Sequence, residues 1–197
     1  MNFNLFGYLI FASVTSITPG PNNLMLFSYG KTYGIYESRK VMLGIFLGFF
    51  IMLCLSGYGI AKIITSSHTG ELILKVFGSL WMLYLAFVLS KLSTETETKD
   101  KPKIGFGQAF FQQFVNSKAW IMAISGASAF MPQFSSIHVN VLLFSSIFAL
   151  VGIPSMFIWL KMGDAIAKII RSDKANRILG HTMFLLMLVT IATIWIK

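Results

Sequence analysis

Charged residues and cysteine are scarce in this chain, and each shortage limits what the chain can be. Only 12% of its 197 residues are charged, 55% are hydrophobic, and the mean hydropathy is +0.73. Soluble domains carry roughly 25% charged residues, and a water-soluble chain this apolar could not cover its own surface. A bilayer removes that difficulty because lipid-facing positions are apolar as well. The composition therefore predicts an integral membrane protein with the lipid bilayer as a partner.

Cysteine occurs once, as Cys54, in the middle of an apolar run. A single thiol cannot form an internal disulfide, and no Cys/His spacing typical of a metal site is present. The chain also lacks a grouping of His, Asp or Glu at helical spacing that would make a nucleophile–base pair or a ligand set. We therefore expect no metal, no cofactor and no enzymatic activity, and we interpret Cys54 as a small packing residue.

Uncharged apolar runs alternate with short charged connections, which predicts an all-α, polytopic membrane helix bundle of about six transmembrane helices. The expected spans are residues 3–27, 41–61, 72–90, 104–131, 137–160 and 178–196. We interpret the first as a retained helix rather than a cleaved signal, because no Lys or Arg precedes it. Residues 161–177 are basic and amphipathic, and we expect them to lie at the membrane interface.

Residues 91–103 have low hydrophobicity and are expected to form a solvated linker near the middle of the chain. The linker divides a single membrane domain (1–197) into a first half, 1–90, and a second half, 104–197, each with three spans. An odd number of spans per half inverts the second half relative to the first, as in many transporters. Lys75-Val-Phe-Gly78 and Arg177-Ile-Leu-Gly180 open corresponding spans. A bundle without internal symmetry is the alternative.

The net charge of +9 comes from basic residues in the connections, which argues against nucleic acid as a partner. With the N-terminus outside, three cytoplasmic connections hold twelve Lys and Arg residues, against three on the external side. The twelve are Lys31, Arg39, Lys40, Lys91, Lys99, Lys101, Lys103, Lys161, Lys168, Arg171, Lys174 and Arg177. The positive-inside rule therefore predicts a multi-pass protein of the inner (plasma) membrane with both termini outside.

Pro19-Gly20-Pro21 interrupts the first span and is followed at once by Asn22 and Asn23. Two prolines around a glycine cannot continue a regular helix, because each removes a backbone donor and clashes with the preceding turn. Irregular backbone at membrane depth is tolerated where it is buried in protein or lines a wet cavity. The helix that restarts near Asn22 would present N–H groups and a positive dipole end to a carboxylate. A kinked, packed helix or a break at the membrane edge is the alternative.

A polar cluster, residues 112–120, occupies the corresponding place in the fourth span. Polar and ionisable residues within the membrane usually face the bundle interior and mark functional sites. Within the cluster, Lys118 could neutralise the carboxylate of a substrate or of the protein. The alternative is that Lys118 lies near the membrane boundary and extends to water.

Four motifs follow one another along the chain: Thr18-Pro19-Gly20-Pro21-Asn22, Gly44-x-x-x-Gly48, Gly78 with Tyr84-Leu85, and Asn116-Ser117-Lys118-Ala119. In order and spacing they resemble the motifs of the LysE/RhtB family of amino-acid exporters, over essentially the whole chain. The family usually has Pro where this chain has Ser117, so we expect a milder second break. The resemblance implies substrate-binding positions at Pro19, Gly20, Pro21, Asn22, Asn23, Asn116 and Lys118.

The resemblance also implies export of a small-molecule substrate, an amino acid or a related metabolite, driven by the proton motive force. Because Lys118 would repel a cationic side chain, a neutral zwitterion is the favoured substrate. Asp164, just past the fifth span, is the acidic residue closest to a coupling position, although a solvated ion pair with Lys161 or Lys168 is the simpler interpretation. Export of another solute such as a metal ion, and a non-transporting membrane scaffold, are the alternative functions.

Three glycines are predicted to serve helix packing: Gly44, Gly48 and Gly78. The spacing of Gly44 and Gly48 matches a motif that lets two membrane helices approach closely. We interpret it as a contact between spans of one chain, with assembly of a homo-oligomer through it as the alternative.

Overall fold

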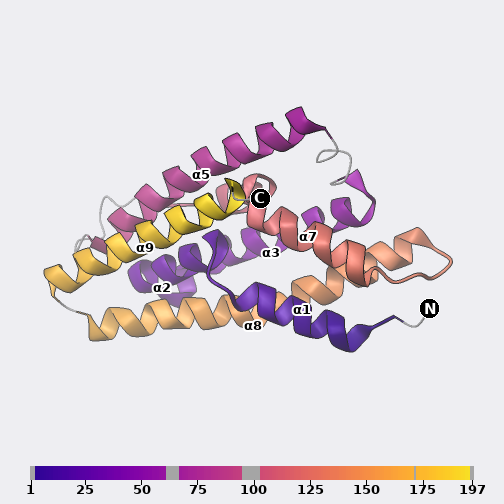
Figure 1. The fold of residues 1–197 in the computed structure, drawn as a ribbon. Coiled ribbons are helices and arrows are strands. Elements are labelled where there is room, and N and C mark those ends of the chain that lie inside the picture. Colours follow the sequence, from indigo (N-terminus) through magenta and orange to yellow (C-terminus); the bar gives the residue numbers. More distant parts are fainter. Residues whose placement is uncertain (1–2, 61–66, 95–102, 171, 196–197) are drawn as a thin grey trace.

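Helices make up the described fold. The computed structural model describes residues 3–60, 67–94, 103–170 and 172–195, and within these ranges it contains no strand (Figure 1). The helices are α1 (Leu5–Ile17), α2 (Pro21–Glu37), α3 (Arg39–Gly57), α5 (His68–Thr94), α6 (Phe106–Val115), α7 (Ser117–Phe130), α8 (Ile137–Ile169) and α9 (Asp173–Trp195). The prediction of an all-α protein is confirmed for the described residues.

Four helices, α3, α5, α8 and α9, are long and apolar enough to cross a membrane. The other helices are shorter and form two interrupted segments, α1–α2 and α6–α7. Large apolar side chains lie exposed on the outside of the bundle, among them Phe77 and Leu80 on α5 and Val189 on α9. Apolar surface of this extent is unfavourable in water and is covered in a bilayer.

Both interruptions occur where the sequence predicts them. After α1 ends at Ile17, Thr18 is extended, and α2 begins with Pro21 in its first turn, where the missing N–H would have had no helical partner. The second interruption is a single residue. Asn116 is extended, and its side-chain oxygen accepts a hydrogen bond from Ala119 N at 3.4 Å, which caps α7. The expected span 104–131 is therefore two helices.

The segment predicted to lie at the membrane interface, 161–177, is not a separate helix. Residues up to Ile169 continue α8 beyond Pro154, and α9 begins at Asp173. An ion pair between Lys168 Nζ and Asp164 Oδ2, at 2.8 Å and four residues apart, stabilises this polar end of α8. The first four residues of the predicted linker continue α5, which ends at Thr94. Residues 95–102 of that linker lie outside the described residues.

The buried apolar residues form two clusters, one on each side of the interruptions. The first combines α1, α3, α7 and α8, with Tyr8 and Phe144 fully buried. The second joins α2, α3, α5, α6, α8 and α9, with Leu26 and Leu160 fully buried. Because α1 belongs to one cluster and α2 to the other, the break between them lies between two apolar cores.

The packing crosses from one half of the chain to the other. α2 lies along α8, α3 along α6, and α5 along α9, and Figure 1 shows the α5–α9 pair on one side of the molecule. On α3, Gly44 and Gly48 face α6, where a Cβ at Gly48 would lie 2.5 Å from Phe110 O. A Cβ at Gly78 of α5 would lie 2.6 Å from Val115 O. These close approaches are within the chain, so α6 occupies the face that carries Gly44 and Gly48.

Candidate functional site

The carboxyl end of α1 leaves carbonyl groups without helical partners, and neighbouring side chains donate to them. Ser155 Oγ donates to Ser16 O at 2.8 Å, and Trp159 Nε1 donates to Ile17 O at 3.0 Å. Asn23 Nδ2, from the first turn of α2, also donates to Ser16 O at 2.7 Å. Since Ser155 and Trp159 both belong to α8, this helix holds the end of α1 in place.

Lys118 reaches the same break from the first turn of α7. Its ammonium group donates to Thr18 O at 2.9 Å, to Thr18 Oγ1 at 2.8 Å and to Pro19 O at 3.1 Å. The position is electrostatically favourable because the carboxyl end of a helix carries a partial negative charge. The approach also depends on Gly20, where a Cβ would lie 2.8 Å from Lys118 Cδ. Lys118 thus points toward the break between α1 and α2.

Asn22 joins the two interruptions. Its Nδ2 donates to Gln113 Oε1 at 2.8 Å, and its Oδ1 accepts from Gln113 Nε2 at 3.0 Å and Gln112 Nε2 at 3.1 Å. Asn116 Nδ2 also points to this oxygen, at 3.4 Å. Gln112, Gln113 and Asn116 are buried. The structure therefore brings together Asn22 and Asn116, 94 residues apart in the sequence, in one amide network that connects α2 with α6 and α7.

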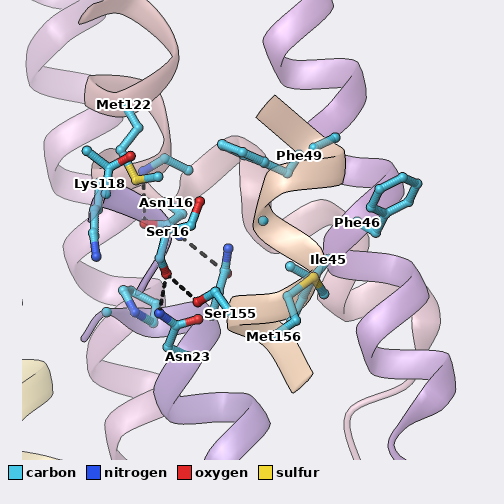
Figure 2. A pocket seen from close by; sticks show the side chains of 17 residues that line it. Ser16, Asn23, Ile45, Phe46, Phe49, Asn116, Lys118, Met122, Ser155 and Met156 are labelled. Atoms are coloured by element: carbon cyan, nitrogen blue, oxygen red, sulfur yellow. Dashed lines mark hydrogen bonds between the residues drawn. The ribbon is translucent and has the colours of Figure 1, made fainter. Parts of the chain in front are cut away.

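A cavity of about 60 Å³ lies beside this network (Figure 2). It is lined by Thr15, Ser16, Gly20, Pro21, Asn22, Asn23, Ile45, Phe46, Phe49, Asn116, Lys118, Ala119, Met122, Ala149, Gly152, Ser155 and Met156. Figure 2 shows polar groups of the two breaks on one side of it and Ile45, Phe46 and Phe49 of α3 on the other. The cavity is large enough to hold water, and its lining combines the polar groups of the breaks with apolar side chains.

A second cavity, of about 390 Å³, lies between α1, α7 and α9. It is lined by Thr15, Thr18, Pro19, Lys118, Ile121, Met122, Leu186, Val189, Thr190, Thr193 and Ile194. The two cavities share Thr15, Lys118 and Met122. Lys118 is the only ionisable side chain that lines either of them within the described part of the chain.

The predicted coupling residue, Asp164, lies apart from this site. It sits near the carboxyl end of α8, lines neither cavity, and pairs with Lys168. No group of three His, Cys, Asp or Glu side chains that could hold a metal ion occurs among the described residues.

Several residues of the site have no place in the sequence prediction of binding positions. Gln112 and Gln113 belong to the polar cluster, and two adjacent amides in an apolar span are a signal that could have identified them. Ser155 and Trp159 lie in the fifth span with no comparable signal. Their roles depend on the packing of α8 against the end of α1.

The LysE type translocator family matches residues 13–193, which is nearly the whole chain. This chain belongs to the LysE-type translocators. The family assignment confirms the resemblance drawn from the four motifs, and it identifies the protein as a membrane transporter rather than an enzyme.

Curated relatives of this translocator include proteins named cysteine/O-acetylserine efflux protein. The relative from Klebsiella pneumoniae is 26% identical over 156 residues, covering 79% of this chain and 80% of its own. The Escherichia coli O157:H7 relative is 28% identical, and that of Salmonella paratyphi A is 29% identical. In both cases 85% of this chain and 86% of the relative are covered. No solved structure matches the chain.

Proposed function

We propose that this translocator exports small neutral amino acids, of the kind represented by cysteine and O-acetylserine, from the cytoplasm across the inner membrane. The observation that carries the proposal is the break between α1 and α2, which borders both cavities. The break exposes the carboxyl end of one helix and the amino end of the next. Helix ends of opposite polarity at one place suit a zwitterion, which has one charge of each sign.

Each charge of the substrate has a matching helix end. The amino end of α2 has no side-chain cap at Gly20, and its partial positive charge favours a carboxylate. The carboxyl end of α1 presents Thr18 O and Pro19 O, which favour an ammonium group. Apolar side chains such as Phe46 and Phe49 line the rest of the first cavity, and no acidic residue lines either cavity. A substrate with a cationic side chain would find no partner there.

Export requires the site to open on each side of the membrane in turn, and an inverted repeat of three plus three spans provides for that. In this proposal α1–α2, α3 and α5 are the first three spans, and α6–α7, α8 and α9 are the last three. Two reciprocal contacts support it: the interrupted span α1–α2 lies on α8, and the interrupted span α6–α7 lies on α3. Glycines permit both, since Gly163 of α8 meets the backbone at Phe27 as Gly48 of α3 meets Phe110. We propose that the halves rock against each other, driven by the proton motive force.

Substitution of Asn22 by alanine tests the function. The change removes the amide that accepts from Gln112, Gln113 and Asn116 and leaves buried amide groups unpaired. We expect Asn22→Ala to abolish amino-acid efflux from cells loaded with dipeptides, measured by analysing every amino acid in the medium, while the protein stays in the membrane.

The matched control is Asn4→Ala, which removes an exposed amide that caps α1 at Gly7 N, away from both cavities. Its efflux should stay at the wild-type level. If the wild-type protein is present in the membrane and no amino acid accumulates faster than in cells without it, the proposed function is wrong.

A further inference from the structure

The position of Lys118 leads to a mechanism for coupling, which rests on the proposed function. We propose that the ammonium group of Lys118 and that of the substrate compete for the same oxygens at the carboxyl end of α1. Binding of a substrate then requires Lys118 to lose its proton, and protonation of Lys118 expels the substrate. The translocator thereby exchanges one proton for one amino acid.

The contacts of Lys118 match those that an amino-acid ammonium group needs. Three oxygens surround Lys118 Nζ within 3.1 Å: Thr18 O, Thr18 Oγ1 and Pro19 O. An ammonium group has three N–H donors and no acceptor, whether it belongs to lysine or to an amino acid. The three oxygens carry no formal charge and form no ion pair with Lys118, so another ammonium group can replace it without leaving a buried carboxylate unpaired.

The second cavity gives the proton a route. Thr18 and Pro19 line it together with Lys118. Four threonines also line it, and each donates its hydroxyl hydrogen to a carbonyl of its own helix, so the hydroxyl oxygens are left as acceptors. These bonds are Thr15 to Phe11 O, Thr18 to Thr15 O, Thr190 to Leu186 O and Thr193 to Thr190 O. The Thr18 oxygen already accepts from Lys118, so the acceptors open to water are those of Thr15, Thr190 and Thr193. A cavity of about 390 Å³ with such acceptors has room for water.

The exchange step is a simple proton transfer. An N–H bond of the Lys118 ammonium group breaks, its electron pair stays on nitrogen, and the proton passes to water in the second cavity. The neutral amine is a weaker donor and no longer attracts the negative end of α1. The oxygens of Thr18 and Pro19 are then available to the substrate. The reverse step, with a proton arriving from the other side of the membrane, releases the substrate there.

No other titratable side chain competes for this role at the two cavities. α1 carries no charged residue. The charged or titratable residues of the helices around the cavities and around α7 line neither cavity. They are Tyr8 on α1, Tyr29, Lys31, Tyr33, Tyr36 and Glu37 on α2, Arg39, Lys40 and Cys54 on α3, His68, Glu71, Lys75, Tyr84 and Lys91 on α5, His138, Lys161, Asp164 and Lys168 on α8, and Asp173, Lys174, Arg177 and His181 on α9. Lys118 is thus the group whose protonation state determines what the end of α1 binds.

Binding of L-cysteine to the purified protein as a function of pH tests this mechanism. The range from about pH 6 to about pH 7.5, with a reductant present, keeps the ammonium and thiol of the ligand protonated. We expect the wild-type protein to bind more tightly as pH rises, by up to about tenfold per pH unit, because binding releases one proton. A pH indicator in weak buffer should record that proton.

Two variants of Lys118 separate the alternatives. Lys118→Met keeps an unbranched chain but has no ammonium, so its affinity should not change with pH and no proton should be released. Lys118→Arg carries a charge that is not lost, so it should bind L-cysteine weakly at every pH. Thr18→Val removes one of the three oxygens and keeps Lys118, and it should weaken binding while keeping the pH dependence. Lys75→Met, which removes a lysine paired with Glu71, is the control and should behave as wild type.

The outcomes distinguish the two proposals. The coupling mechanism is wrong if Lys118→Met binds L-cysteine with the pH dependence of the wild type, or if it still releases a proton. The proposed exporter function would be unaffected by that result. Wild-type protein that binds L-cysteine without pH dependence and without proton release overturns it as well, whether or not the Lys118 variants fold. If the wild type binds no L-cysteine at any pH, the proposed substrate class is wrong and the mechanism falls with it.

Discussion

The lack of a side chain at Gly20 determines how closely Lys118 approaches the break. A Cβ there would lie 2.8 Å from Lys118 Cδ and 2.9 Å from Lys118 Nζ. The backbone of Gly20 is extended, so alanine can adopt it without strain. We therefore expect Gly20→Ala to fold and to displace the ammonium from Thr18 and Pro19. Since hydrogen bonds to a charged group contribute about 1.5–3 kcal/mol each, efflux should fall at least about tenfold.

Gly7→Ala is a close control for that experiment. A Cβ at Gly7 would also meet the polar end of a flexible side chain, 2.7 Å from Asn4 Nδ2, but on α1 away from both cavities. Efflux should be compared with the amount of each variant in the membrane. Equal efflux for Gly20→Ala and Gly7→Ala would mean that the position of Lys118 does not matter for transport.

Some residues of the site could be predicted from the sequence, and others could not. Prolines within an apolar run leave the backbone few options, so the break at Pro19 and Pro21 follows from local chemistry. The partners of that break do not. Ser155 and Trp159 donate to α1 only because α8 passes beside it, and contacts across 139 and 142 residues leave no local pattern in the sequence.

At the scale of the elements, α6 depends on glycines in its neighbours. Gly48 of α3 faces its backbone, and a Cβ there would lie 2.5 Å from Phe110 O and 2.8 Å from Gln113 Cγ. The backbone carbonyl cannot move aside as a flexible side chain can. We expect Gly48→Ala to destabilise the protein by about 1–3 kcal/mol and to lower the midpoint of thermal unfolding in detergent.

Gly107→Ala provides the comparison within α6, because nothing lies within 4 Å of a Cβ at Gly107. Alanine is preferred to glycine inside a helix by roughly 1 kcal/mol, so this variant should unfold at the wild-type temperature or slightly above it. If Gly48→Ala is equally stable, α3 and α6 are not as close as we describe.

The ends of the helices are harder to predict from the sequence than the breaks within the spans, and α8 shows why. Charged residues from Lys161 onward suggest that the fifth span has ended, yet α8 continues to Ile169. The helix does not have to end where the apolar run ends, because Asp164 and Lys168 lie one turn apart and pair on its surface. Composition reports where the membrane ends, whereas hydrogen bonding within the backbone decides where the helix ends.

At the scale of the whole molecule, described parts of three basic connections lie close together. Lys103, which precedes α6, lies 5.3 Å from the centre of the Tyr33 ring on α2. A Cβ at Gly34 of α2 would lie 3.8 Å from Asp164 Oδ1 of α8. The end of α2, the start of α6 and the end of α8 therefore meet at the same end, although the sequence assigns them to three separate connections.

Because these connections lie close together, one measurement of membrane topology tests the orientation of the whole protein. The sequence assigns twelve Lys and Arg residues to these three connections, against three in the connections and terminus of the other side. The positive-inside rule predicts that the side with twelve faces the cytoplasm. Both termini should then lie outside.

A C-terminal alkaline phosphatase fusion should be active and a C-terminal green fluorescent protein fusion dark. The same two reporters fused after residue 97, within the predicted linker, should give the opposite pair. Fluorescence at the C-terminus would show that the orientation is the reverse of our prediction. The proton that reaches Lys118 in our mechanism would then have to enter from the end that we assign to the cytoplasm.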